Sequence, residues 1–263
     1  MNNFRDTWRK KGMPCRIGTT SYIIPADILP NLAFLKDVVE DVELVLFESD
    51  EYSNLPTRSD VREMGVIAES AGLSFTVHLP LDAWPGSADE SVRTNSVDKW
   101  LRVMDLMAPL SPFGWVVHLN DPPAAGSWDQ WLMQCDRTID ALIDQTDPEL
   151  LCVETLSYDF ERVYPLVVEK GCSVCMDIGH LLLTNRDVPA DLAAWFGRTR
   201  IIHLHGVNAQ GRDHVGLGHM DPVLLTHLVA MLKDPGHFPR VLTLEVFSLD
   251  DLQSSLSVLE SVI

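Results

Sequence analysis

Eight short apolar segments, rich in β-branched residues, constrain the fold of this chain more than any other feature. They lie at residues 16–20, 42–48, 74–79, 114–119, 150–155, 173–178, 200–204 and 241–246. Their hydrophobicity is nearly continuous, which is typical of parallel strands that are buried on both faces. We therefore expect eight strands in one parallel sheet.

Segments with helical periodicity separate these strands, at residues 60–71, 87–107, 128–143, 159–170, 189–196, 222–232 and 250–262. Three of them are followed by Gly72, Gly171 or Gly197, where a helix C-cap favours a left-handed residue. A strand–helix alternation repeated eight times in about 250 residues predicts an α/β fold of the (β/α)8 TIM-barrel type.

The competing fold is a doubly wound sheet, which usually has fewer strands and a glycine-rich turn after its first strand. Here residues 18–22 read Gly-Thr-Thr-Ser-Tyr, without the G-x-G-x-x-G pattern. No linker, repeat or low-complexity tract divides the chain. We expect one TIM-barrel domain over residues 1–263, in which residues 1–14 form an N-terminal extension.

Composition limits the partners of the protein. A net charge of −18 argues against a nucleic-acid binder, because such proteins gain affinity by neutralising phosphates with a basic face. Five cysteines without regular spacing do not form a disulfide framework, which favours the reducing cytoplasm. No apolar run of about 18 residues occurs, so we expect no membrane partner. The expected partner is a small-molecule substrate.

Possible metal ligands stand at the ends of seven consecutive strands. In a TIM barrel these ends share one mouth, so the residues can be combined into one site. The strand ends carry Glu48, His78, His118, Glu154, Asp177, His203 and Glu245, and the loops add His180, Asp213 and His214. Buried carboxylates are costly unless they are paired or bind metal. The joint arrangement predicts divalent ions, Zn²⁺ or Mn²⁺, two or three per chain.

Taken singly, each of these residues has an ordinary structural explanation. A strand-end histidine is more often a hydrogen-bonded core residue than a ligand, and Glu154 or Asp177 alone could cap a helix or form an ion pair. His205 should point to the same side as His203, as a second-choice ligand or a group behind the ligands. His219 is the alternative to His214. For Gly216-Leu-Gly218 a flexible turn is the usual explanation, and Cys172-x-x-Cys175 has no second pair that would make a zinc site.

These motifs together resemble the xylose isomerase-like TIM-barrel superfamily, over residues 16–247. The matching motifs are Val77-His-Leu79, Val117-His-Leu119, Val153-Glu-Thr155, Asp177-Ile-Gly-His180, His203-Leu-His205, Asp213-His214 and Leu244-Glu245. The ligand number is most similar to the endonuclease IV branch. That resemblance implies one ion on His78, His118 and Glu154, a second on Glu154, Asp177, His203 and Glu245, and a third on His180, Asp213 and His214.

One loop departs from the endonuclease IV pattern. That family places the loop Asp and His two residues apart, before a Gly-Glu-Gly turn, whereas here Asp213 and His214 are adjacent and Gly-Leu-Gly follows. The third ion is therefore the least supported. Endonuclease IV also binds DNA through basic and aromatic loops. The acidic composition of this chain argues against such a role.

The N-terminal part is similar to the cobamide-remodelling phosphodiesterases of this superfamily, in residues 18–28 (GTTSYIIPADI) and 42–48 (VELVLFE). The resemblance implies a metal-dependent hydrolase that cleaves the phosphoribosyl linkage in the nucleotide loop of corrinoid cofactors. We expect catalytic roles for Glu154, Asp177 and Glu245, and substrate contacts for Glu48, Trp84 and His205.

Other functions remain open on the same fold. A sugar or hydroxy-acid isomerase or epimerase would use Glu154 and Glu245 across one metal ion for proton transfer. An endonuclease IV-like phosphodiesterase would act on DNA. A non-catalytic corrinoid- or sugar-binding barrel would not need so complete a set of ligands.

Overall fold

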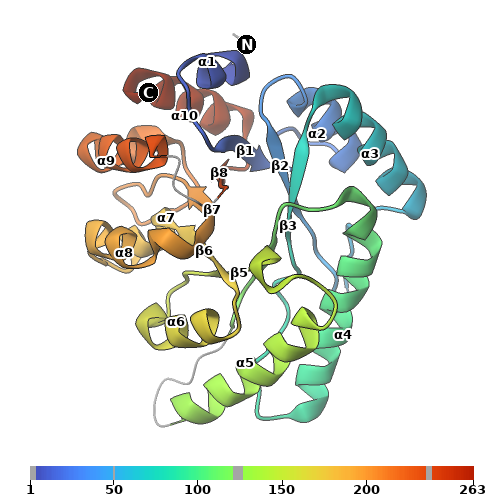
Figure 1. Cartoon of the computed structure of the whole chain (residues 1–263). Coiled ribbons are helices and arrows are strands. Elements are labelled where there is room, and N and C mark those ends of the chain that lie inside the picture. The colour runs from blue at the N-terminus through green and yellow to red at the C-terminus, as the bar shows by residue number, and fades with distance from the viewer. Residues whose placement is uncertain (1–3, 50, 121–126, 235–238) are drawn as a thin grey trace.

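A closed barrel of eight parallel strands forms the centre of the protein (Figure 1). The computed structural model describes residues 4–49, 51–120, 127–234 and 239–263. The strands are β1 (Arg16–Thr20), β2 (Asp41–Val45), β3 (Ser74–His78), β4 (Trp115–Val117), β5 (Leu151–Glu154), β6 (Ser173–Asp177), β7 (Thr199–Leu204) and β8 (Val241–Leu244). They follow one another around the barrel in chain order, and β1 pairs with β8 to close it. The predicted TIM barrel is confirmed, and the doubly wound sheet is excluded.

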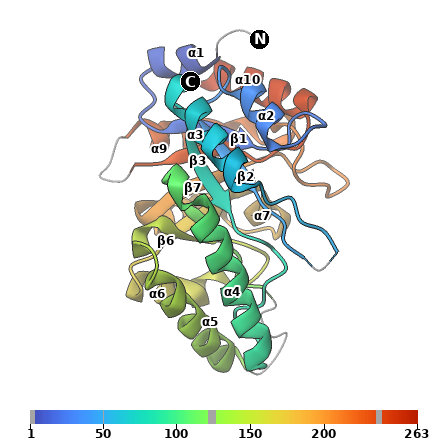
Figure 2. The same ribbon diagram turned by 90° about the vertical axis from the view of Figure 1, so that its right-hand side faces the viewer.

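Helices surround the barrel in both views (Figures 1 and 2). They are α1 (Phe4–Lys10), α2 (Ile28–Leu35), α3 (Arg58–Ala71), α4 (Glu90–Met107), α5 (Trp128–Ile143), α6 (Phe160–Glu169), α7 (Ile178–Leu183), α8 (Val188–Trp195), α9 (Pro222–Lys233) and α10 (Leu249–Val262). Short 3₁₀ turns are η1 (Ala108–Leu110), η2 (Pro148–Leu150), η3 (Phe196–Arg198) and η4 (Leu217–His219). Within the described ranges, no helix is both long and apolar enough to cross a bilayer.

Several predicted details differ from the structure. β4 ends at Val117 and β8 ends at Leu244, so His118 and Glu245 directly follow their strands. β2 ends at Val45, so Glu48 lies beyond the strand, where it forms an isolated bridge with Ser53. Gly72 and Gly171 have φ of 62° and 72°, as the C-cap prediction requires. Gly197 lies within η3 instead. The residue that caps the C-terminus of α8 is Phe196, which has a right-handed conformation and begins η3. The left-handed cap at Gly197 was a wrong prediction.

The N-terminal segment also packs on the barrel. Phe4 and Trp8 of α1 are buried, and the Trp8 indole donates a hydrogen bond of 2.8 Å to the Cys15 carbonyl. Figure 1 shows α1 beside α10, and Lys11 Nζ donates to the carbonyl of Ile263 at 3.3 Å. The two ends of the chain therefore meet on one side of the barrel.

The barrel interior is built in layers. Outward side chains of the strands pack against the helices in the main core, whereas Val116, Cys152, Cys175 and Ile201 form a separate apolar cluster with Phe113. Because successive side chains of a strand alternate between its two faces, the next inward residues toward the C-terminal ends include His118, Glu154, Asp177 and His203. An apolar floor thus lies beneath a polar mouth.

Candidate metal centre at the barrel mouth

Glu154 lies at the centre of the polar mouth. Its Oε2 atom is 2.6 Å from Nε2 of His118 and 3.3 Å from Nε2 of His78. Its other oxygen, Oε1, is 3.3 Å from Nδ1 of His203. One carboxylate therefore presents its two oxygens to two different sets of imidazoles, which is the geometry of a carboxylate that can bridge two ions.

The first set is His78, His118 and Glu154, whose possible ligand atoms lie within 4.8 Å of one another. Nδ1 of His78 lies 3.0 Å from the Leu79 carbonyl, and donating a proton there leaves Nε2 to face Glu154. The sequence-predicted members of the first ion site are thus brought together.

The second set is Glu154, Asp177, His203 and Glu245, again within 4.8 Å and all buried. His203 Nδ1 lies 3.3 Å from Glu245 Oε2 and 3.9 Å from Asp177 Oδ2. Three carboxylates and one imidazole thus converge on a fully buried point. These are the four residues predicted for the second ion.

Asp177 has two roles, one for each oxygen. It is the N-cap of α7, and its Oδ1 accepts the backbone N–H of His180 at 2.7 Å. Its Oδ2 atom points toward His180 Nδ1 at 3.4 Å. The cap therefore fixes the direction of the carboxylate and starts the short helix that brings His180 to the mouth.

The third set differs in part from the prediction. His180, His205 and His214 lie within 4.8 Å, so His205 joins the group that was expected to contain Asp213. Asp213 is at the rim, 39% exposed, with Oδ1 at 3.1 Å from Nδ1 of His214 and Oδ2 at 3.9 Å from Nε2 of His180. The alternative loop residue, His219, is exposed in η4. The geometry therefore favours His214 over His219 as the candidate ligand from this loop.

Glycine makes this third set possible. A Cβ atom on Gly179 would lie 2.0 Å from Cε1 of the His205 ring. A side chain there would overlap the imidazole, which is fully buried. The glycine of the Asp-Ile-Gly-His motif therefore allows α7 to pack directly against His205.

The loop after β7, which contains the Gly216-Leu-Gly218 turn, is hydrogen-bonded to itself and to α10. Gly206 and Val215 form an antiparallel bridge, and the Gly216 N–H donates to Asp251 Oδ1 at 2.8 Å. The Leu217 N–H donates to Ser255 of α10 at 3.1 Å. These bonds hold His214, whose φ of 51° is rare for a residue other than glycine.

Unsatisfied polar atoms gather at the mouth. Among the described residues, buried atoms without a hydrogen-bond partner include Asp177 Oδ2, His180 Nδ1, His205 Nε2 and Glu245 Oε2. Leaving a buried polar atom unpaired costs about 1–3 kcal/mol. Cations would satisfy all four, and imidazole and carboxylate oxygen are the ligands that Zn²⁺ and Mn²⁺ accept. The residues present fit a cluster of divalent metal ions.

Mutual attraction perturbs the titration of these groups. Burial by itself raises the pKa of Glu154, but the charges of His118 and His203 hold that pKa well below its ordinary value. Burial likewise raises the pKa of Glu245. His203 and His214 lower this pKa more strongly, so that it lies well below its ordinary value. Both carboxylates are therefore ionised at neutral pH, as metal ligands must be.

The imidazoles shift in the opposite direction. Burial lowers the pKa of His78, but the hydrogen bond and charge of Glu154 outweigh burial and raise it to about 9. Burial also lowers the pKa of His214, but Glu245 and Asp213 outweigh burial and raise this pKa to about 9. Burial also raises the pKa of the Cys175 thiol well above its ordinary value, so this neighbour of Glu154 and His203 stays protonated and is a poor ligand.

Two predicted substrate contacts lie away from the ligand sets. Partly buried Glu48 lies on the loop after β2. Trp84, 41% exposed, lines a groove of about 680 Å³ together with Asp82 of the same loop and with Lys99 and other residues of α4. His205, the third predicted contact, lies within the mouth itself.

Sequence reasoning missed Glu43. This inward-facing residue of β2 is fully buried, and its Oε2 atom lies 2.8 Å from Nε2 of His203. The signal was present as two carboxylates, Asp41 and Glu43, two residues apart in a strand that is buried on both faces. Such spacing places both side chains on one face.

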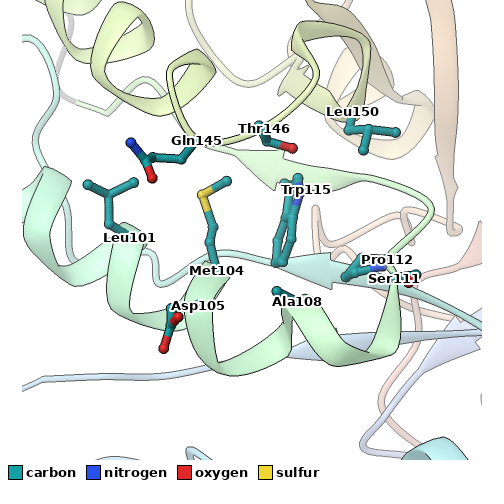
Figure 3. A pocket seen from close by; sticks show the side chains of 10 residues that line it. All are labelled: Leu101, Met104, Asp105, Ala108, Ser111, Pro112, Trp115, Gln145, Thr146 and Leu150. Carbon is teal, nitrogen blue, oxygen red and sulfur yellow. The ribbon is translucent and has the colours of Figure 1, made fainter.

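An apolar groove of about 760 Å³ adjoins the mouth, lined among others by Tyr22, Phe47 and Phe247 from the loops after β1, β2 and β8. The Phe247 ring is 44% exposed and its centroid lies 5.3 Å from that of His214. A different cavity, of about 440 Å³, is drawn in Figure 3. It lies between α4, η1 and the start of β4, at the opposite ends of the strands, and contains no candidate ligand.

The sequence matches the model of a known protein family over most of its length. The model of the xylose isomerase-like TIM barrel matches residues 37–262. The chain belongs to the xylose isomerase-like TIM-barrel family. No functionally curated protein matches the sequence.

Solved structures share the fold of this chain at low sequence identity. A D-tagatose 3-epimerase-like protein matches with a TM-score of 0.74 and 18% identity, over 94% of this chain and 96% of that chain. The 3-keto-D-glucoside 4-epimerase YcjR from E. coli matches with a TM-score of 0.69 and 16% identity, over 94% and 98%. A xylose isomerase domain protein from Planctomyces limnophilus matches with a TM-score of 0.69 and 14% identity, over 95% and 96%. At these identities the likeness extends to the fold alone.

Proposed function

We propose that this protein is a metal-dependent phosphodiesterase. The observation that carries the proposal is the position of Glu154, whose Oε2 faces His78 and His118 while Oε1 faces His203. Sites with two adjacent ions are typical of enzymes that cleave phosphoesters, whereas proton transfer in a sugar needs no such pair. When bound, adjacent divalent ions supply an activated water and neutralise the charge of the phosphodiester.

We propose further that the substrate is a cobamide, cleaved at the phosphoribosyl linkage of its nucleotide loop. Support comes from the similarity of residues 18–28 and 42–48 to the cobamide-remodelling family. Hydrolysis would break the bond between phosphorus and the ribose oxygen. The hydroxyl of water goes to phosphorus and its proton to the ribose oxygen, which yields a corrinoid phosphate and an α-riboside.

The groove beside the mouth suits the flat, apolar part of such a substrate. Tyr22, Phe47 and Phe247 offer aromatic surface, and Phe247 is in contact range of His214. Aromatic rings stabilise planar bases by stacking. We propose that the lower-ligand base lies in this groove while the phosphate faces the ligand sets.

An epimerase is the second candidate, and one arrangement favours it. Glu154 Oε1 and Glu245 Oε2 each lie 3.3 Å from His203 Nδ1, so both carboxylates can flank a single ion as a proton-transfer pair. Epimerases are also among the solved structures of similar fold. The histidine pair His78 and His118 has no task in that reaction.

The test is incubation of the metal-loaded protein with adenosylcobalamin, followed by chromatography of the products. Release of α-ribazole together with a phosphorylated corrinoid is the expected result. A Glu154→Ala variant, with an unchanged circular dichroism spectrum, should release none. No release by the wild type, combined with epimerisation of a ketose, would overturn the proposal in favour of the second candidate.

A further inference from the structure

Glu43 lies inside the barrel, on the side of His203 that faces away from the candidate ligands. Both side chains are fully buried, and Glu43 Oε2 lies 2.8 Å from His203 Nε2. The other ring nitrogen, Nδ1, faces Glu154 and Glu245 at 3.3 Å each. The imidazole therefore separates one carboxylate below from the candidate metal ligands above.

The other neighbours of Glu43 do not account for its burial. Thr76 Oγ1 is 3.5 Å from Glu43 Oε2 but 2.9 Å from Asp41 Oδ1. The Thr76 hydroxyl can donate only one hydrogen bond, and it donates that bond to Asp41. The second oxygen, Oε1, has no hydrogen-bond partner among the described residues. Since a buried carboxylate is costly without strong partners, the contact with His203 is the compensating one.

We propose that Glu43 is a positioning residue that prepares His203 to bind metal. Glu43 accepts a hydrogen bond from the Nε2–H group of His203. This bond selects the tautomer whose Nδ1 lone pair faces the mouth. It also fixes the ring plane. Carboxylates behind a ligating histidine orient the ring and increase its basicity. The role concerns metal binding and is independent of which reaction the centre performs.

The test compares three variants by metal affinity, measured by competition with a chromophoric chelator. Glu43→Ala removes the acceptor, and Glu43→Gln keeps an acceptor oxygen at the same place. Asp41→Asn is the matched control, because Asp41 is buried on the same face of β2 but contacts Ser74 and Thr76. Glu43→Ala should bind the ion of the second set about 10–100-fold more weakly. Glu43→Gln should recover most of this loss, and Asp41→Asn should bind as the wild type does.

A second readout reports the tautomer directly. In metal-free protein at a pH above the raised pKa of His203, where the imidazole is neutral, the ring ¹⁵N shifts of His203, assigned with a His203→Gln variant, should place the proton on Nε2. Glu43→Ala should lose this preference, and Glu43→Gln should retain it. The proposal is overturned if Glu43→Ala binds metal within about threefold of the wild type, or if Asp41→Asn loses as much affinity. It is equally overturned if Glu43→Gln, the variant least disturbing to the fold, places the proton on Nδ1.

Discussion

Nε2 of His118 lies 2.6 Å from Oε2 of Glu154, the shortest approach of an imidazole to this carboxylate among the described residues. The same carboxylate approaches His203 through its other oxygen at 3.3 Å. Glu154 is therefore shared between two ligand sets that arise from different strands. The proposed function depends on this sharing, because it places two cations close enough to act on one phosphate.

Removing the His118 imidazole should abolish turnover without unfolding the protein. His118→Ala deletes one member of the first ligand set while the barrel core stays intact. We expect kcat/KM for adenosylcobalamin to fall by at least about 100-fold, since even groups behind metal ligands cost 10–100-fold. His219→Ala, at an exposed histidine of η4, is the matched control and should retain wild-type activity. Near-wild-type rates for His118→Ala would contradict the role of this set.

A methyl group on Gly179 should disturb the third ligand set. Because a Cβ atom there would lie 2.0 Å from the His205 ring, Gly179→Ala must displace the imidazole or α7. We expect a loss of metal affinity of about tenfold or more, measured by chelator competition. Gly218→Ala is the control, because no heavy atom within 4 Å would meet its Cβ. Equal affinities in the two variants would show that His205 and α7 do not contribute to metal binding.

Metal binding should release protons at neutral pH. The pKa values of His78 and His214 are raised to about 9 in the metal-free protein, so both imidazoles are protonated at pH 7.5. Ligands must lose these protons, and metal affinity should therefore rise with pH up to about 9. Calorimetry in buffers of different ionisation enthalpy should detect the release of protons, at least about two if both histidines bind metal. Release of none would contradict the participation of these two histidines.

The same shifts predict how the stability of metal-free protein depends on pH. A histidine whose pKa is raised on folding contributes stability that is fully present below its unfolded value, about 6.5, and is lost as pH rises through the folded value. For His78 that value is about 9. Urea unfolding of metal-stripped protein should therefore give a lower free energy of unfolding at pH 9.5 than at pH 6. His78→Gln should reduce this difference, and an unchanged pH dependence in this variant would contradict the prediction.

Substrate affinity should depend on the aromatic groove beside the mouth. Phe247→Ala removes an exposed ring near His214, and we expect KM for adenosylcobalamin to rise about tenfold with a smaller change in kcat. Trp84→Ala is the companion variant, because Trp84 lines the separate groove along α4. A rise in KM in Trp84→Ala alone would move the binding site to that groove.

The strands were predictable because the barrel imposes the same pattern eight times. Burial on both faces makes each strand a continuous apolar run, and the polar residue that ends the run stands at the common mouth. β1 has the predicted bounds, 16–20, and Asp177 ends β6 as expected. A fully buried strand does not reveal where it stops, however. The apolar run 42–48 therefore predicts a strand that ends at Glu48, whereas β2 ends at Val45.

The site was less predictable than the fold, since its finer geometry depends on contacts between elements. Glu43 was missed because it lies within an apolar run rather than at its end. α7 was missed because its six residues are too few for a periodic pattern, although Asp177 is a favourable N-cap residue. The place of His205 beside His180 depends on the bare Cα of Gly179, which sequence spacing alone does not disclose.

The number of metal ions bound per chain shows whether Glu154 is shared between two ions. Protein reconstituted with Zn²⁺ or Mn²⁺ and freed of loosely bound metal can be measured by inductively coupled plasma mass spectrometry against the protein concentration. We expect two or more ions per chain, and fewer ions in Glu154→Ala, which removes the carboxylate shared by the first and second sets. A single ion per wild-type chain would contradict the shared centre and favour the epimerase.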